Sequence, residues 1–218
     1  MASTRSRLPL SRDRILQAAL ALADEHGVEA LSMRKLGQAL GFEAMSLYNH
    51  VQNKDDVLNG ILDLVIAETE PADPAAPWDA AIRRSAISIH DALRRHPWAA
   101  KLLTSAGHVR AERLRQMDAL LACLREAGFS EETTYHAYHV LDGHVIGFTL
   151  WEISHSSMQL PDDTDLRALL DRIVPADAFP DLHEHGRRHM TAGPHRETSA
   201  FEFGLDLILD GLRQLHAA

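Results

Sequence analysis

The sequence predicts an all-α protein in two parts, a small N-terminal three-helix unit and a larger helical body. Apolar residues recur at helical spacing along most of the 218 residues, and prolines gather between these stretches, with none from Pro9 to Pro71 or from Pro97 to Pro161. Alternating apolar and polar runs flanked by hairpin turns, which indicate strands, are absent. A composition of 45% apolar and 24% charged residues is typical of a packed globular protein and excludes wholesale disorder.

The N-terminal unit is expected to contain helices near residues 11–26, 32–39 and 43–50, followed by a helix near 54–70, with Ser11, Ser32 and Asn53 as caps. Residues 15, 18, 19, 22 and 26 put apolar side chains and a histidine at helical spacing. The same stretch follows four arginines and imitates a secretory signal peptide. Asp13 and Gln17 interrupt it, which favours the first helix of the fold.

The body is expected to contain helices near residues 78–95, 98–105, 109–127, 131–157, 163–173 and 198–216, with Ser130 and Thr198 as caps. The Pro- and Asp-rich stretch 70–77 is expected to be a linker. The segment 174–197, which holds three prolines, two glycines and four histidines, is expected to be irregular. These boundaries predict two domains, residues 1–58 and 59–218.

Charge is distributed unevenly between the two parts. Residues 1–60 carry seven basic and seven acidic side chains, whereas residues 61–218 carry fifteen and twenty-four, which accounts for the whole net charge of −9. A neutral head can approach a polyanion that an acidic body would repel. The single Cys123 excludes an intrachain disulfide, and no apolar run is long enough to span a membrane, so a cytoplasmic protein is expected.

Residues 30–54 carry the most informative pattern. Two short helices meet at Gly41, which can end the first of them in the left-handed conformation, and Leu36, Phe42 and Leu47 can pin the second against it. The outward side of the second helix offers small or hydrogen-bonding side chains, a surface suited to the major groove of DNA. The pattern indicates a helix-turn-helix.

The chain resembles the TetR family of transcriptional regulators, and within it the tetracycline repressors. The resemblance is strongest over the helix at 14–26 and residues 31–36, 40–41, 46–51 and 53–58, and weaker over 127–130 and 201–212. It implies a helix-turn-helix DNA-binding domain followed by a helical ligand-binding and dimerisation domain. It also implies a homodimeric repressor that a small-molecule effector releases from a palindromic operator in double-stranded DNA.

The resemblance places residues 43–50 on the recognition helix. The DNA-binding residues that it implies are Arg34, Glu43, Ala44, Met45, Ser46, Tyr48, Asn49, His50 and Lys54. Arg34 and Asn49 are the expected base readers, since arginine can bond both O6 and N7 of guanine. Ser46, Tyr48 and Lys54 are the expected phosphate anchors.

Each of these assignments has a structural alternative. Arg34 could be a solvated helix charge, Lys54 could be only a first-turn cation, and His50 could be a packing histidine. Leu47 is expected in the core. Ala44 and Met45 depart from the polar residues often found there and leave the operator sequence open.

Two helices of the body carry apolar stripes, and the last helix carries two of them. One stripe of the last helix comprises Phe201, Leu205, Ile208, Leu212 and Leu215, and a second comprises Phe203 and Leu207. The stripe of the helix at 131–157 comprises Tyr138, Leu141, Val145 and Phe148. Gly143 and Gly147 leave a smooth patch on the latter helix. We expect these helices to pair in a homodimeric four-helix bundle, with burial inside one subunit as the alternative.

An effector cavity is expected among the helices at 78–95, 98–105, 109–127 and 131–157. Its candidate lining residues are Trp98, Leu102, Met117, Leu120, His144, Phe148 and Trp151, each of which could instead be plain core. Tetracycline is a doubtful effector because the metal-binding histidine of the tetracycline repressors has no clear equivalent, and His108 lies in a different local setting.

Eight of the fourteen histidines lie between residues 136 and 195. His136 and His139, or His183, His185 and His189, could form a metal site, and a metal-dependent enzyme is the alternative that this permits. No H-E-x-x-H motif is present. We expect no metal, no cofactor and no enzyme activity. A dimeric interaction protein with a degenerate DNA-reading head is a further alternative.

Overall fold

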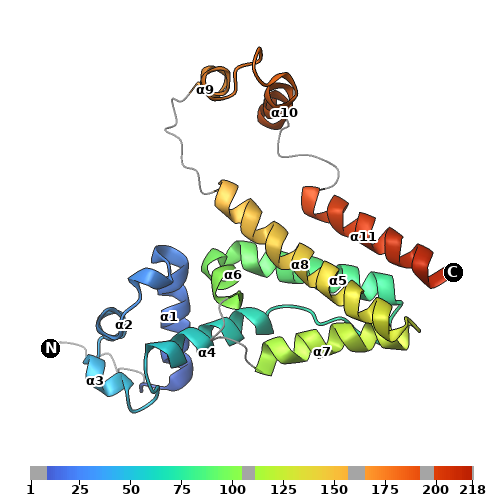
Figure 1. Cartoon of the computed structure of the whole chain (residues 1–218). Helices are drawn as coiled ribbons and strands as arrows, with labels where there is room; N and C mark the ends of the chain where they lie inside the picture. Colours follow the sequence, from blue (N-terminus) through green and yellow to red (C-terminus); the bar gives the residue numbers. More distant parts are fainter. Residues whose placement is uncertain (1–8, 105–110, 157–164, 192–198, 218) are drawn as a thin grey trace.

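The computed structural model describes residues 9–104, 111–156, 165–191 and 199–217, and every regular element in these ranges is helical (Figure 1). The elements are α1 (Arg12–His26), a 3-10 turn (Val28–Ala30), α2 (Met33–Leu40), α3 (Ala44–Leu47), α4 (Lys54–Ala67), α5 (Trp78–Arg95), α6 (Pro97–Leu103), α7 (Ala111–Glu126), α8 (Glu131–Ser156), α9 (Leu166–Ile173), α10 (Pro180–Thr191) and α11 (Ala200–Ala217). The all-α prediction is confirmed. None of the helices in these ranges is long and apolar enough to cross a membrane.

Most of the predicted helix starts are correct because local capping chemistry sets them. The side chains of Ser11, Ser32, Asn53 and Ser130 each accept a hydrogen bond from the backbone amide three residues later. Thr198 lies outside the described residues, and Ser199 accepts the corresponding bond at the start of α11. Each of these bonds satisfies one amide that the first turn of a helix leaves without a partner.

Two predictions about the elements were wrong. The recognition helix ends at Leu47 rather than residue 50, because the Leu47 carbonyl accepts from the amides of both His50 and Val51 and the chain turns there. The segment 174–197 contains α10, which starts at Pro180, where the missing N–H of proline is harmless. The stretch 70–77 is, as expected, a non-helical and mostly exposed connection between α4 and α5, although Ala72 within it is buried.

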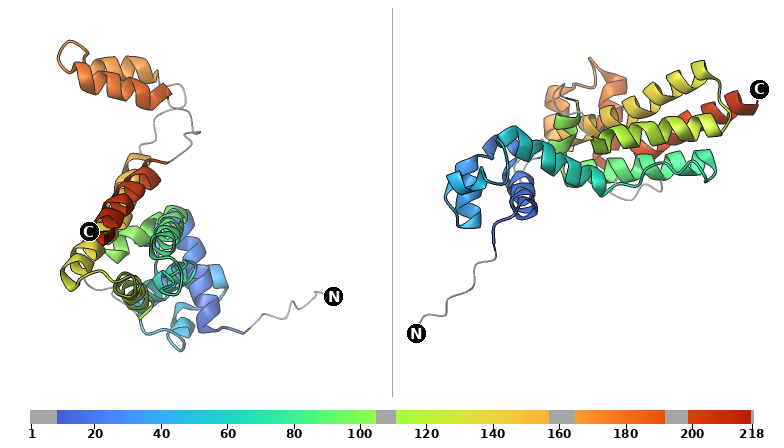
Figure 2. Two further views of the ribbon diagram at one scale, coloured as in Figure 1. Left: turned by 90° about the vertical axis from the view of Figure 1, so that its right-hand side faces the viewer. Right: turned by 90° about the horizontal axis from the view of Figure 1, so that it is seen from below.

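The helices form a head and a body that share one continuous core. In Figures 1 and 2, α1 to α3 lie at one end of the molecule, and α4 runs from them into the body formed by α5 to α8 and α11. The buried apolar residues of both parts form a single cluster in space, which includes Ile15 of α1 and Leu212 of α11. Because α4 contacts α1, α5 and α7, it crosses the proposed domain boundary at residue 58 and joins the two parts mechanically.

Helices α9 and α10 form a separate hairpin beyond the ends of α8 and α11 (Figure 1). Leu170 of α9 is buried against α10 at Gly186, where an added Cβ would lie 2.7 Å from a Leu170 methyl carbon. Several apolar side chains around this hairpin remain exposed, among them Leu166, Ile173, Phe179 and Leu182.

Gly41 ends α2 in the left-handed conformation, with φ 75° and ψ 29°, and directs the chain into α3. A side chain at this conformation costs about 1–2 kcal/mol. We therefore expect Gly41→Ala to lower the free energy of unfolding by about 1 kcal/mol or more, measured by urea denaturation. Gly41→Asn is the control, because asparagine tolerates this region better than other residues with side chains. Equal losses in both variants would contradict a conformational origin.

Candidate nucleic-acid interface and ligand cavity

The recognition segment is anchored by one buried residue and presents the rest outward. Leu47 is fully buried, as predicted, while Met45 is 75% and Tyr48 is 45% exposed. Glu43, Asn49 and His50 are also exposed, and Ala44 and Ser46 are half-buried. The geometry therefore gives α3 and the turn after it one outward face of mixed apolar and hydrogen-bonding character.

Arg34 and Lys54 flank this face differently. Arg34 is exposed on α2. Lys54 is half-buried at the first position of α4, and its ammonium donates to the Val28 carbonyl at 3.3 Å. This bond ties the start of α4 to the turn after α1, so Lys54 has a structural role that the sequence interpretation did not include. An ammonium has three donors, which leaves others for a phosphate.

An ion pair beside α3 was not anticipated from the sequence. Arg12 donates two hydrogen bonds of 2.8 Å to the Asp56 carboxylate, which also accepts from the Gln52 amide. The bond to Asp56 raises the pKa of the Arg12 guanidinium. Together with Tyr48 and the residues that follow it, this pair lines a polar hollow of about 640 Å³. The pair fixes the starts of α1 and α4 relative to the recognition segment.

A polar cluster, in which only His96 and Trp98 are buried, joins the head to the body. The Asp24 carboxylate on α1 accepts 2.7 Å hydrogen bonds from the His96 ring and from the indole N–H of Trp98. Glu68, just after α4, lies 3.5 Å from the other ring nitrogen of His96 and pairs with Arg95. Trp98, a predicted ligand-lining residue, therefore faces α1 rather than a cavity.

A small, partly open cavity lies between α5, α7 and α8. Its lining residues occupy the same helical spacing on each helix: Ile82, Ser85, Ala86 and Ile89 on α5, Arg113, Gln116, Met117 and Leu120 on α7, and Tyr138, Leu141, Asp142 and Val145 on α8. Met117 and Leu120 belong to the predicted ligand set. The volume of about 30 Å³ is enough for about one water molecule, so a larger ligand would have to push the helices apart.

Most of the cavity wall is apolar, and its charged groups neutralise one another. The Arg113 guanidinium pairs with the Asp142 carboxylate. Burial raises the pKa of the Tyr138 hydroxyl, which keeps the phenol neutral. Gln116 is buried and donates to the Thr69 hydroxyl just after α4. Such a site suits a largely apolar ligand that carries a few polar groups.

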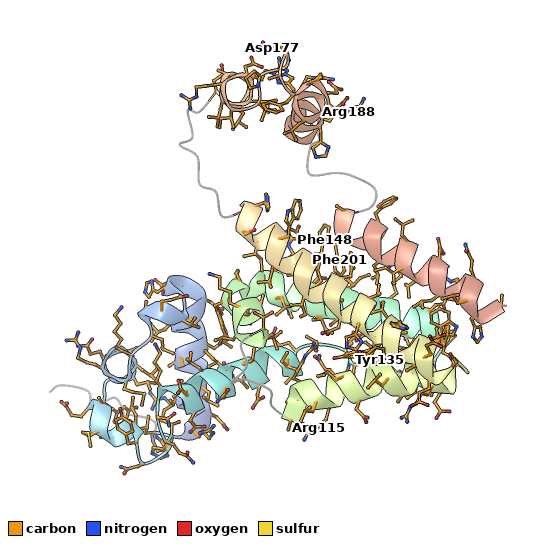
Figure 3. The ribbon with its side chains drawn as sticks, viewed as in Figure 1. Arg115, Tyr135, Phe148, Asp177, Arg188 and Phe201 are labelled. Carbon is orange, nitrogen blue, oxygen red and sulfur yellow. The ribbon has the colours of Figure 1, made fainter. Side chains whose placement is uncertain are left out.

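The other predicted ligand residues lie elsewhere. Figure 3 shows Phe148 of α8 beside Phe201 of α11, and the two rings meet edge to face with centroids 5.9 Å apart. His144 contacts the Phe201 carbonyl at 2.9 Å. Trp151 is half-exposed near the end of α8, and Leu102 of α6 is half-buried against the core. None of these four residues lines the cavity between α5, α7 and α8.

The outer face of α8 and α11 is apolar and has no cover within the described residues. Its exposed side chains include Val140 and Trp151 on α8 and Phe203, Leu207 and Leu215 on α11, and an open groove of about 390 Å³ runs between the helices. Gly143 and Gly147 are exposed on the same helix with open space beside them, as a close helix approach requires.

The stripe at Tyr138, Leu141 and Val145, expected in the bundle, faces the cavity instead. Phe201, Leu205 and Leu212 of the first α11 stripe are buried in the subunit, whereas Phe203 and Leu207 of the second stripe are exposed.

The histidines do not assemble a metal site among residues whose placement is described: no three His, Cys, Asp or Glu side chains lie close enough to share an ion. His139 contacts the Tyr135 carbonyl, and His183 contacts the Val174 carbonyl. The side chain of His189 lies outside the described residues.

Two family descriptions match the chain. Residues 15–61 match the bacterial regulatory proteins of the tetR family, and residues 70–216 match the tetracyclin repressor-like C-terminal domain. The repressor DrrR1 of Streptomyces coeruleorubidus is 31% identical over 217 residues, covering 95% of this chain and 79% of that protein. The class E tetracycline repressor of Escherichia coli is 33% identical over 205 residues, covering 93% and 90%. The TetR family protein ActR of Streptomyces coelicolor, solved in complex with actinorhodin, superposes with a TM-score of 0.71 at 27% identity, covering 97% and 100%.

A helix-turn-helix head on a larger helical body defines a class of DNA-binding regulators. The two matches together cover nearly the whole chain, and the protein belongs to the TetR family of bacterial regulatory proteins. It is a ligand-responsive, DNA-binding transcriptional regulator of the repressor type.

Proposed function

We propose that the protein is a cytoplasmic homodimeric repressor, without catalytic activity, that reads a palindromic operator with Arg34, α3 and the turn that follows. The observation that carries this proposal is the outward face of α3, where a fully buried Leu47 supports exposed Met45, Tyr48 and Asn49. Two such faces about 34–36 Å apart would meet successive major grooves on one side of the duplex. Arg34 and Asn49 would read bases, and Ser46, Tyr48 and Lys54 would hold phosphates.

We propose that the outer faces of α8 and α11 form the dimer interface. Exposed apolar side chains on both helices, and the groove between them, favour a second copy as the cover, since two copies of this helix pair make a four-helix bundle. This arrangement uses the second α11 stripe, at Phe203 and Leu207, and the glycine patch of α8.

We propose the cavity between α5, α7 and α8 as the effector site. It lies between three helices and is lined mainly by apolar groups, and Met117 and Leu120 are the members of the predicted ligand set on its wall. The complex of ActR with actinorhodin supports a small organic effector for this chain as well. An effector larger than the present cavity would displace α7 or α8, so its binding would change the positions of these helices.

The proposed readout is tested with Arg34→Ala and Tyr48→Phe on the promoter fragment upstream of the protein's own gene. We expect Arg34→Ala to weaken binding by about 10-fold or more, because a bidentate arginine–guanine contact contributes about 1–3 kcal/mol of discrimination. Tyr48→Phe is expected to weaken binding less, as it removes one phosphate hydrogen bond. Both are measured by fluorescence anisotropy.

Leu114→Ala is the control, since Leu114 is exposed on α7 and belongs to neither the recognition segment nor the residues that flank it. Binding by the unsubstituted protein should also weaken steeply between about 50 and 200 mM salt, as counterion release requires. Unchanged affinity in both head variants would favour the interaction protein with a degenerate reading head.

A further inference from the structure

The Gln116 side chain has one amide atom that the protein does not use. Gln116 lines the cavity and is only 8% exposed, and its Oε1 is buried with no hydrogen-bond partner among the described residues. A buried amide oxygen without a partner costs free energy, about 1–3 kcal/mol. A ligand that donates a hydrogen bond to this oxygen would recover that cost.

The neighbouring hydrogen bonds decide which end of the amide is left over. The Thr69 hydroxyl donates to the Ile66 carbonyl at 2.7 Å, so its single hydrogen is already used. Towards Gln116 the same hydroxyl can therefore only accept, which requires the NH₂ group of the amide. The oxygen is consequently the free atom, so this residue of the cavity wall has an acceptor rather than a donor left for a ligand.

The rest of the cavity argues for a neutral ligand. Arg113 and Asp142 already neutralise each other, and Tyr138 keeps its proton. An ionised ligand would have to break that ion pair inside an apolar wall, which is costly. A carboxylate placed against Gln116 Oε1 would meet like partial charge. The surroundings favour a neutral, mainly apolar molecule with a hydroxyl or N–H donor.

The same amide also connects the cavity to the head. Gln116 lies on α7, and its partner Thr69 directly follows α4, the helix that starts beside the recognition segment. Since the cavity has room for only about one water, a ligand must displace its walls. A shift of α7 would then pull on Thr69, which is bonded to the last turn of α4 through Ile66.

We infer that Gln116 recognises a hydroxyl or N–H donor on a neutral apolar effector, and that its bond to Thr69 passes the resulting movement of α7 to α4. This inference rests on the proposed effector site. The chemical class of effector is thereby a neutral apolar donor, and Gln116 and Thr69 are the residue pair through which effector binding changes the affinity for DNA.

The test compares two probes of the same ring system, 2-naphthol, which carries a donor, and 2-methoxynaphthalene, which does not, with 2-naphthoate as the anion. In titration calorimetry on the full-length dimer, 2-naphthol is expected to bind about tenfold more tightly than 2-methoxynaphthalene or 2-naphthoate. This is the difference in affinity that one buried hydrogen bond provides. Gln116→Leu should bring 2-naphthol and 2-methoxynaphthalene within about twofold of each other. Gln116→Met repeats the test at closer volume, and Gln17→Leu, an exposed glutamine on α1, is the control.

Coupling is measured separately on the promoter fragment. Saturating 2-naphthol is expected to weaken DNA binding by the unsubstituted protein at least about fivefold, the lower range of allosteric coupling. Thr69→Val should reduce this effect to less than about twofold while the preference for 2-naphthol remains.

Three results would overturn the role of Gln116 as the acceptor for the effector. They are equal binding of the probes, no binding of 2-naphthol, and a preference for 2-naphthol that survives in both Gln116 variants. Full coupling in Thr69→Val would overturn the link to α4. DNA binding measured without any probe tests the proposed function by itself. A failure of the proposed function would appear as a loss of DNA binding in the absence of probe, whereas a failure of the inference about Gln116 and Thr69 would appear only in the probe experiments.

Discussion

Leu207→Asp is expected to convert the dimer into folded monomers and to weaken operator binding at least about 100-fold. Leu207 is 59% exposed on α11, so a carboxylate there can stay hydrated in the monomer and leave the subunit core intact. In the proposed four-helix bundle the same carboxylate would be buried without a partner, which strongly disfavours association. Loss of the second reading head then removes the avidity of two linked contacts, worth about 10²–10⁴-fold.

Analytical ultracentrifugation and anisotropy on the promoter fragment measure the two effects, and circular dichroism checks that the monomer is folded. Leu114→Asp is the matched control, because it places the same change on an equally exposed leucine of α7. A Leu207→Asp protein that remains dimeric would refute the proposed interface, and a monomer with unimpaired operator binding would refute the dimeric readout.

The sequence predicts those parts of the fold that short-range chemistry determines. Ser11, Ser32 and Asn53 cap helices because a side-chain oxygen can reach an amide three residues away, whatever the rest of the chain does. Gly41 and Leu47 likewise set the turn and the anchor of the helix-turn-helix within a few residues. The reading head could therefore be located before any long-range contact was known.

The cavity could not be located in this way, since its walls come from three distant helices. Tyr138, Leu141 and Val145 form an apolar stripe whose period fits a dimer seam and a cavity wall equally well, and only packing decides between them. Trp98 was assigned to the cavity on residue type, but its indole N–H is bound by Asp24, 74 residues earlier in the chain. The ion pair between Arg12 and Asp56 was also missed, because its two residues lie 44 positions apart in the chain.

Asp24→Ala is expected to destabilise the protein by about 3 kcal/mol and to weaken both operator binding and its response to effector. The Asp24 carboxylate is the shared acceptor for His96 and Trp98, which are 8% and 6% exposed, so its loss leaves two buried donors unsatisfied at about 1–3 kcal/mol each. It also removes the polar contact between α1 of the head and α6 of the body. The head would then be held mainly by α4, and the orientation of α3 would be less well defined.

Urea denaturation gives the free energy of unfolding, and the promoter fragment with and without 2-naphthol gives the binding and its response. Glu25→Ala is the control because Glu25 is the next residue on α1 and its side chain is 72% exposed, so little should change. Asp24→Asn should fall between the two, since it keeps an acceptor but loses the charge that strengthens both bonds. If Asp24→Ala were as stable as Glu25→Ala, the cluster would not hold the head to the body, and α4 alone would have to carry the signal from the cavity to the DNA.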